Sequence, residues 1–184
     1  MKISHEFVVA RPVDQVWDYF QDVPSVADCL PGAELLEDKG DGKYSGKVSV
    51  KLGPMAATFE GDATVTPDAA AKSGKIDGKG ADRRGGSRGQ VKVDYQLAAE
   101  GSGTKVNLDA DVTLSGAAAQ FGRTGLINEI SGRLIEEFVE CVEAKLAATT
   151  VEEAAEIKAG EVSGFAVFIQ GLIAWLRKLF KRGE

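Results

Sequence analysis

The chain has almost none of the residues from which metal centres and nucleophilic catalytic sites are built. Its 184 residues include one histidine, His5, and two cysteines, Cys29 and Cys141. One histidine cannot supply a histidine-rich metal site, and the cysteines lack CxxC spacing. No nucleophile elbow supports a Ser-His-Asp or Cys-His arrangement. We therefore predict a non-enzymatic protein with no catalytic residue, no metal and no covalently bound cofactor. His5 alternates with Ile3 and Phe7, which indicates a strand at a sheet edge or a pocket wall.

The scarcity of cysteine also bears on the compartment. Cys141 lies in a helical apolar pattern, which predicts a buried free thiol. The first residues after Met1 alternate and include Glu6, so they do not resemble an export signal. Both features favour a reducing cytoplasm.

Positive charge is outnumbered, with 22 Lys and Arg against 28 Asp and Glu. An acidic body argues against nucleic-acid binding. Arg83, Arg84 and Arg88 form a small basic cluster in a glycine-rich stretch, but the pattern of a phosphate-binding loop is missing. We predict a solvated hairpin tip there, with a partner contact as the less favoured alternative.

Alternating apolar and polar residues dominate the middle of the chain. Antiparallel strands are predicted over residues 3–9, 44–52, 57–65, 91–97 and 106–114, with weaker strands near 34–38 and 70–78. The glycine-rich stretch from Gly74 to Gly89 is interpreted as a turn region. Short helices are predicted after Pro12 and around residues 26–30, and a long helix is predicted from about Ala117 to Leu146. This order predicts an α+β fold in which a curved antiparallel sheet of about seven strands wraps around the long C-terminal helix.

Many inward positions of these strands carry small residues, among them Gly46, Ala57, Gly61, Ala63 and Ala110. Small residues under a glycine-containing helix leave apolar space, which is costly unless a ligand fills it. We predict a hydrophobic ligand cavity, with a small tight core as the alternative. The candidate lining residues are inward or helix-stripe residues: Phe59, Tyr95, Leu97, Phe121, Ile127 and Leu134.

The last two dozen residues differ from the acidic body. No charge occurs between Glu161 and Arg177, and the region has four basic and two acidic residues. The apolar helical face comprises Phe165, Phe168, Ile169, Leu172, Trp175, Leu176 and Leu179. The basic residues beside it are Arg177, Lys178, Lys181 and Arg182. The charge-free stretch would rise about 22 Å as a helix, short of a hydrocarbon core of about 30 Å. We predict an amphipathic helix that lies in an anionic membrane surface. A helix docked on its own domain or on a partner is the alternative.

Several motifs together resemble the family of the carbon monoxide dehydrogenase G subunit, within the START-like (SRPBCC, helix-grip) superfamily. The resemblance is carried by V-x-x-P-x-x-x-V-W-x-x-F over residues 9–20, by L-P-G-A at 30–33, by L-G-P-M at 52–55, by F-E-G at 59–61 and by S-G-A-A-A-Q-F-G at 115–122. It spans about Met1 to Leu146. The resemblance implies a helix-grip domain with a deep apolar cavity. It also implies an accessory role beside a molybdenum-containing carbon monoxide dehydrogenase. A quinone, another isoprenoid or a lipid would be a fitting ligand.

These observations divide the chain into a ligand-binding domain over residues 1–146, a linker or exposed helical spacer over 147–163, and a membrane-associating tail over 164–184. The favoured function is an accessory protein that binds a quinone-like ligand, recruits a carbon monoxide dehydrogenase-type enzyme to the membrane, or does both. The expected location is the cytoplasm, peripherally at the inner face of the cytoplasmic membrane. A general lipid-transfer protein and a recruitment adaptor without a ligand are the alternatives. A helix-grip enzyme such as a cyclase or hydrolase is disfavoured, since no acid–base pair is evident.

Overall fold

The computed structural model describes residues 1–52, 55–123, 126–148 and 150–159, and the predicted membrane tail lies outside them. The elements follow one another as β1 (Lys2–Val9), α1 (Val13–Gln21), α2 (Val23–Asp28), β2 (Ala33–Gly40), β3 (Lys43–Leu52), β4 (Met55–Asp68), β5 (Ser73–Asp82), β6 (Ser87–Glu100), β7 (Gly103–Ser115), the 3₁₀ helix η1 (Gly116–Arg123), α3 (Leu126–Ala147) and α4 (Val151–Glu156). The strands predicted from alternation are present.

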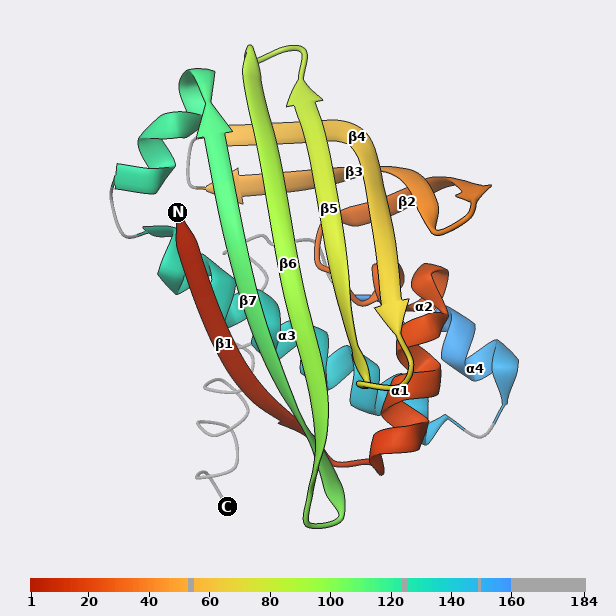
Figure 1. Ribbon diagram of the computed structural model, residues 1–184. Helices are drawn as coiled ribbons and strands as arrows, with labels where there is room; N and C mark the ends of the chain where they lie inside the picture. The colour runs from red at the N-terminus through yellow and green to blue at the C-terminus, as the bar shows by residue number, and fades with distance from the viewer. Residues whose placement is uncertain (53–54, 124–125, 149, 160–184) are drawn as a thin grey trace, which may run out of the picture.

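The seven strands form one antiparallel sheet in the order β1-β7-β6-β5-β4-β3-β2. The N-terminal strand therefore pairs with the last one, and Ile3 lies opposite Ala110. Figure 1 shows α3 crossing one face of the sheet while α1 and α2 lie at one end of it. We call the face toward α3 the inner face. The predicted curved sheet around a long C-terminal helix is confirmed.

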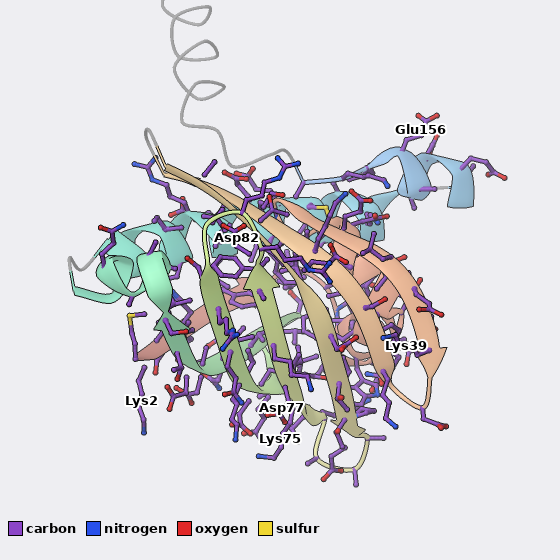
Figure 2. The ribbon with its side chains drawn as sticks, turned by 90° about the horizontal axis from the view of Figure 1, so that it is seen from above. Lys2, Lys39, Lys75, Asp77, Asp82 and Glu156 are labelled. Atoms are coloured by element: carbon purple, nitrogen blue, oxygen red, sulfur yellow. A yellow bond between two sulfur atoms is a disulfide. The ribbon has the colours of Figure 1, made fainter. Side chains whose placement is uncertain are left out.

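The outer face of the sheet is polar and carries complementary charges. Lys2 and Lys92 both lie opposite Asp111, and Asp77 lies opposite Lys92. Figure 2 shows Lys2, Lys75 and Asp77 projecting on the side of the sheet away from α3. Alternating charges across neighbouring strands favour this pairing, although exposed ion pairs contribute only a few tenths of a kcal/mol each, up to about 1 kcal/mol.

The hydrophobic core lies at the end of the sheet where α1, α2 and the C-terminal half of α3 meet. Val9, Val16, Val106 and Val142 are fully buried there, together with Trp17, Leu97 and Phe138, which are nearly so. Phe20 of α1 makes edge-to-face contacts with Tyr95 and with Phe138. Burying each such aliphatic side chain contributes about 1.5–3 kcal/mol, so this end stabilises the fold.

Two sequence-based boundaries are wrong. The glycine-rich stretch from Gly74 to Gly89 forms most of β5 and the start of β6, and only the turn between Asp82 and Ser87 is irregular. Glycine is a weak strand former, but an extended backbone between two partners still completes both hydrogen-bond ladders. The helix predicted from Ala117 begins at Leu126, because the preceding segment forms the 3₁₀ helix η1.

The prediction of a buried free thiol is also wrong. Cys29 and Cys141 form a disulfide, with their Cα atoms 5.4 Å apart. Both residues are buried, at 0% and 6% exposure. Helical periodicity identifies Cys141 as a core position but says nothing about which side chain it faces. Free thiols therefore no longer support a reducing compartment.

Candidate ligand site on the inner face of the sheet

The inner face has two halves that differ in how well they are covered. We call the half under α1 and the C-terminal part of α3 the packed half; it includes Val9, Tyr95, Leu97 and Val106, all buried. We call the rest the open half. Its wall consists of half-buried residues in neighbouring strands: Ile3, Phe59, Ala63, Val91, Val93, Ala110, Val112 and Leu114. The register places Ile3, Ala110 and Val93 in one row across three strands.

The open half is apolar, yet none of the wall residues just named is buried. Val48, on β3 opposite Phe59, is 44% exposed. A domain normally covers the apolar face of its sheet, and an apolar face that stays partly accessible is a candidate binding surface. This incomplete cover is the feature of the fold that most directly bears on function.

A row of four glycines crosses the open half. Gly46 pairs with Gly61, Gly61 with Gly80, and Gly80 with Gly89, on four successive strands. A Cβ added at Gly61 would lie 1.9 Å from the backbone oxygen of Lys79. Strand β4 pairs with β5 only from Glu60 onward, and Figure 1 shows β4 bending sharply between its two partners. Gly61 is therefore required for the bend, so its small size does not by itself indicate empty space.

Phe59 immediately precedes this bend and lies near Gly80 and Gly89. A Cβ added at Gly89 would lie 3.7 Å from Cδ1 and Cε1 of the Phe59 ring, and one at Gly80 would lie 3.4 Å from the Phe59 Cβ. The absence of side chains at Gly80 and Gly89 thus leaves room for the Phe59 ring to pack against the sheet. Phe59 is half-buried and forms part of the wall of the open half.

Two of the other predicted lining residues do not belong to the open half. Tyr95 and Leu97 lie in the packed half, at 7% and 4% exposure. The Tyr95 hydroxyl lies against Gly74 of β5, and burial raises the pKa of Tyr95, which keeps the hydroxyl protonated. Leu134 is half-buried on α3. The side chains of Phe121 and Ile127 lie outside the described residues, and a ligand contact by any of the six stays a prediction.

One polar contact on the inner face was not predicted. His5 Nε2 lies 2.8 Å from Oγ of Ser131, which is on α3. The strand alternation had placed His5 at a sheet edge or pocket wall, and β1 is an edge strand with His5 on its inner face. Ser131 lies seven residues before Phe138, so the helical period of the core stripe would have placed it toward the sheet.

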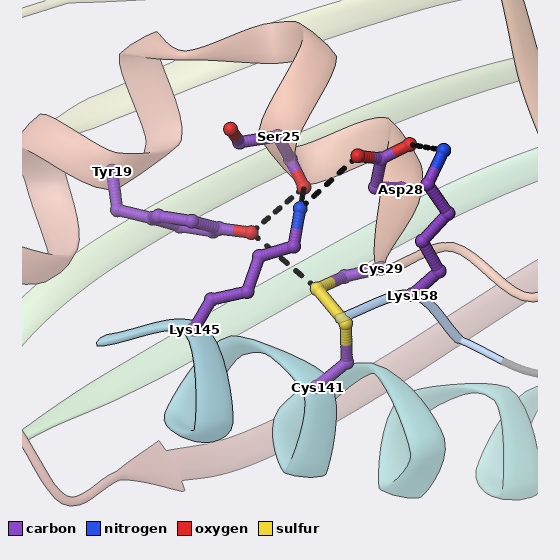
Figure 3. Close-up of a disulfide and its surroundings, with 7 residues drawn as sticks. All are labelled: Tyr19, Ser25, Asp28, Cys29, Cys141, Lys145 and Lys158. Atoms are coloured by element: carbon purple, nitrogen blue, oxygen red, sulfur yellow. Dashed lines mark hydrogen bonds and ion pairs between the residues drawn. A yellow bond between two sulfur atoms is a disulfide. The ribbon is translucent and has the colours of Figure 1, made fainter. Parts of the chain in front are cut away.

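The disulfide is the centre of a second cluster at the opposite, packed end. Figure 3 shows Lys145 of α3 between Ser25 and Asp28 of α2, beside the bond from Cys29 to Cys141. Lys145 Nζ donates to the Ser25 carbonyl oxygen and to Asp28 Oδ2, both at 3.2 Å, and its side chain is only 3% exposed. The Tyr19 hydroxyl donates to the same Ser25 carbonyl at 2.8 Å. Burial raises the pKa of Tyr19 well above its ordinary value, so the hydroxyl remains a donor.

The segment after α3 returns to this cluster. Ile157 packs against the core, the backbone N–H of Ala159 donates to the Asp28 carbonyl oxygen at 2.9 Å, and Lys158 Nζ lies 3.2 Å from Asp28 Oδ1. Within the predicted spacer, Val151–Glu156 forms α4, whose first turn is capped by the Thr150 hydroxyl. The last described residue, Ala159, is thus attached to α2 beside the disulfide.

Comparison with known proteins identifies the family. The family model for the G subunit of carbon monoxide dehydrogenase (CoxG) matches residues 6–147. The chain belongs to the CoxG family. No curated protein matches the chain.

Solved structures similar to this CoxG family member support the fold. A conserved protein from Geobacillus kaustophilus is 18% identical, with a TM-score of 0.70, covering 80% of this chain and 95% of that one. The Zhui aromatase/cyclase from Streptomyces sp. R1128 is 18% identical, with a TM-score of 0.53, covering 80% of this chain and 96% of that one. TTHA0849 from Thermus thermophilus is 15% identical, with a TM-score of 0.59, covering 82% of this chain and 100% of that one. These similarities establish the helix-grip fold of this chain.

Three further observations concern the surface and composition of the CoxG domain. A hollow of about 700 Å³ lies mainly on the outer face and is lined by charged and polar residues, including Asp68, Lys75 and Asp94. Its lining does not suit a lipophilic ligand. In the described ranges, no cluster of three or more His, Cys, Asp and Glu residues could hold a metal ion. None of the helices that the structure describes has the length and hydrophobicity required to span a membrane.

Proposed function

We propose that the open half of the inner face binds a lipophilic, quinone-like molecule and that the protein serves a carbon monoxide dehydrogenase-type enzyme as a non-catalytic accessory protein. The incomplete cover of an apolar sheet face is the observation that carries this proposal. Membership of the CoxG family supports the enzyme partner. Any redox chemistry would then take place in the partner.

The membrane attachment is proposed from sequence, since residues 160–184 lie outside the described residues. An apolar helical face with four adjoining basic residues is suited to an anionic membrane surface, and each basic residue near that surface contributes about 1 kcal/mol. We place the protein at the inner face of the cytoplasmic membrane. The Cys29–Cys141 disulfide weighs against this location, because disulfides are rare in the cytoplasm.

Organic extraction of the full-length protein, purified from a quinone-producing host, tests ligand binding. We expect an isoprenoid quinone or related lipid at near-stoichiometric amount. Ala63→Phe and Ala110→Phe add bulk to the wall of the open half and should reduce the extracted ligand severalfold. Overpacking costs about 1–3 kcal/mol, so thermal unfolding is measured in parallel.

Ala98→Phe is the matched control. Ala98 lies on β6 but is exposed at an outer-face position opposite Lys105. This variant should retain the ligand of the wild type. If the wild-type extract holds only background lipid, the binding proposal fails and recruitment without a ligand becomes the better account.

A liposome flotation assay tests the tail separately. Deletion of residues 161–184 should abolish flotation with anionic vesicles while leaving a folded domain, and Phe168→Glu or Trp175→Glu should act in the same direction. Equal flotation of the truncated and intact proteins would refute membrane attachment through the tail.

A further inference from the structure

The contact between His5 and Ser131 joins the edge strand β1 to α3 at a defined level of the inner face. His5 lies in a row with Leu108 and Tyr95, and Tyr95 is buried in the packed half. The next row contains Ile3, Ala110 and Val93, which belong to the open half. The pair therefore stands at the boundary between the packed core and the apolar wall, and both residues are half-buried.

His5 has hydrogen-bonding capacity beyond this contact. A neutral imidazole has one N–H donor and one bare nitrogen acceptor. Nε2 is engaged with Ser131, and among the described residues Nδ1 has no hydrogen-bond partner. One tautomer makes Nδ1 a donor, which suits a carbonyl oxygen; the other makes it an acceptor, which suits a hydroxyl group.

A ligand that covers the open half displaces water from this boundary. A purely hydrocarbon ligand would leave Nδ1 without a partner, and an unsatisfied polar group under an apolar cover is costly. A ligand with an oxygen at the same position replaces the lost water. A histidine at this position would therefore discriminate between ligands of similar shape that differ in oxygen content.

We propose that His5 is the polar recognition point of the inner-face site, held by Ser131 as a positioning residue, and that it selects amphiphiles with a ring carbonyl or hydroxyl over hydrocarbons. The apolar residues of the open half bind the remainder of such a molecule. This inference rests on the proposed function, and it adds a specificity determinant that an apolar cavity alone does not provide.

Equilibrium dialysis of the full-length protein with two probes of one carbon skeleton tests the inference. The probes are 2-methyl-1,4-naphthoquinone and 2-methylnaphthalene, which differ in the two carbonyl oxygens. The measured quantity is the ratio of the affinity for the quinone to the affinity for the hydrocarbon. His5→Phe keeps an aromatic ring without nitrogen and should lower quinone affinity by about threefold to tenfold, the range expected for one hydrogen bond. Affinity for the hydrocarbon should stay within twofold or rise.

Variants of Ser131, the residue on α3 that contacts His5, extend the test. Ser131→Ala should reduce the ratio in the same direction, and Ser131→Thr, which keeps a hydroxyl group, should retain it. The double variant of His5→Phe with Ser131→Ala should lose no more than His5→Phe alone, because the serine acts through the ring. Ser4→Ala is the matched control: it removes a hydroxyl group from the same strand, but that group bonds to Asp109 on the outer face.

The outcomes separate this inference from the proposed function. If both probes bind and the ratio is unchanged in His5→Phe, the role of His5 is refuted while ligand binding stands. If neither probe binds the wild type, the binding proposal fails and this inference fails with it. Circular dichroism reports whether each variant folds. If His5→Phe does not fold, the contrast between Ser131→Ala and Ser131→Thr decides the question.

Discussion

Removal of the disulfide should destabilise this protein by an amount that its position in the chain predicts. Cys29 and Cys141 are separated by 112 residues. In the chain-entropy model, a closed loop of that length removes about 4.8 kcal/mol of denatured-state entropy at 25 °C, and measured values for native disulfides are typically 2–4 kcal/mol. We expect Cys29→Ala with Cys141→Ala to lower the free energy of unfolding by about 2–5 kcal/mol.

Urea denaturation followed by circular dichroism measures this change. Each single variant should lose nearly as much as the double variant, since either substitution breaks the same bond. The wild type in excess dithiol reductant should approach the double variant, with the elements of the fold retained. Each Cys→Ala substitution also removes a buried sulfur atom, and the small cavity that it leaves adds to the loss.

Thiol alkylation gives an independent check. When the wild type is unfolded in denaturant without reductant, mass spectrometry should find no alkylated cysteine, and prior reduction should give two. Two alkylated cysteines in the unreduced protein would show that the bond is absent. A loss below about 0.5 kcal/mol in the double variant would refute the idea that the cross-link restricts the denatured chain.

Four other substitutions follow from the packing and are measured by the same denaturation assay. Gly61→Ala should destabilise by about 3 kcal/mol or more, because its Cβ would lie 1.9 Å from a backbone oxygen; a loss below about 1 kcal/mol would show that the bend can relax. Gly132→Ala makes the same chemical change on α3, where a Cβ meets nothing within 4 Å, so it should stabilise by about 1 kcal/mol through helix propensity. A destabilised Gly132→Ala would contradict the open space seen there. Asp28→Ala should cost about 3 kcal/mol because it leaves the ammonium of Lys145 buried without its carboxylate, whereas Lys145→Met should cost less. Equal losses for these two variants would contradict the reasoning.

The pattern of the sequence predicted the sheet well because strand alternation is a local property. The runs around β3, β4, β6 and β7 alternate every second residue, and each forms a strand at about the predicted place. Strand β5 was predicted only weakly, because its glycines carry no apolar pattern. Its place is set by hydrogen bonding to β4 and β6 on either side.

The candidate site could be predicted only in part. Phe59 was named from its inward position, and the structure places it in the open half. Tyr95 and Leu97 have the same inward alternation, yet they lie in the packed half under α1 and α3. Alternation shows which face of the sheet a residue lies on, but not whether a helix covers it. That cover comes from elements distant in the chain.

The sequence by itself determined which strand residues face inward, where most strands are centred, and to which family the chain belongs. Only the tertiary structure decided that Gly46, Gly61, Gly80 and Gly89 form one row, that Cys29 meets Cys141, and that His5 meets Ser131. The periodicity of apolar residues and the local composition carry information about only a few neighbouring residues. Each of these three contacts joins segments whose approach depends on the register and curvature of the whole sheet.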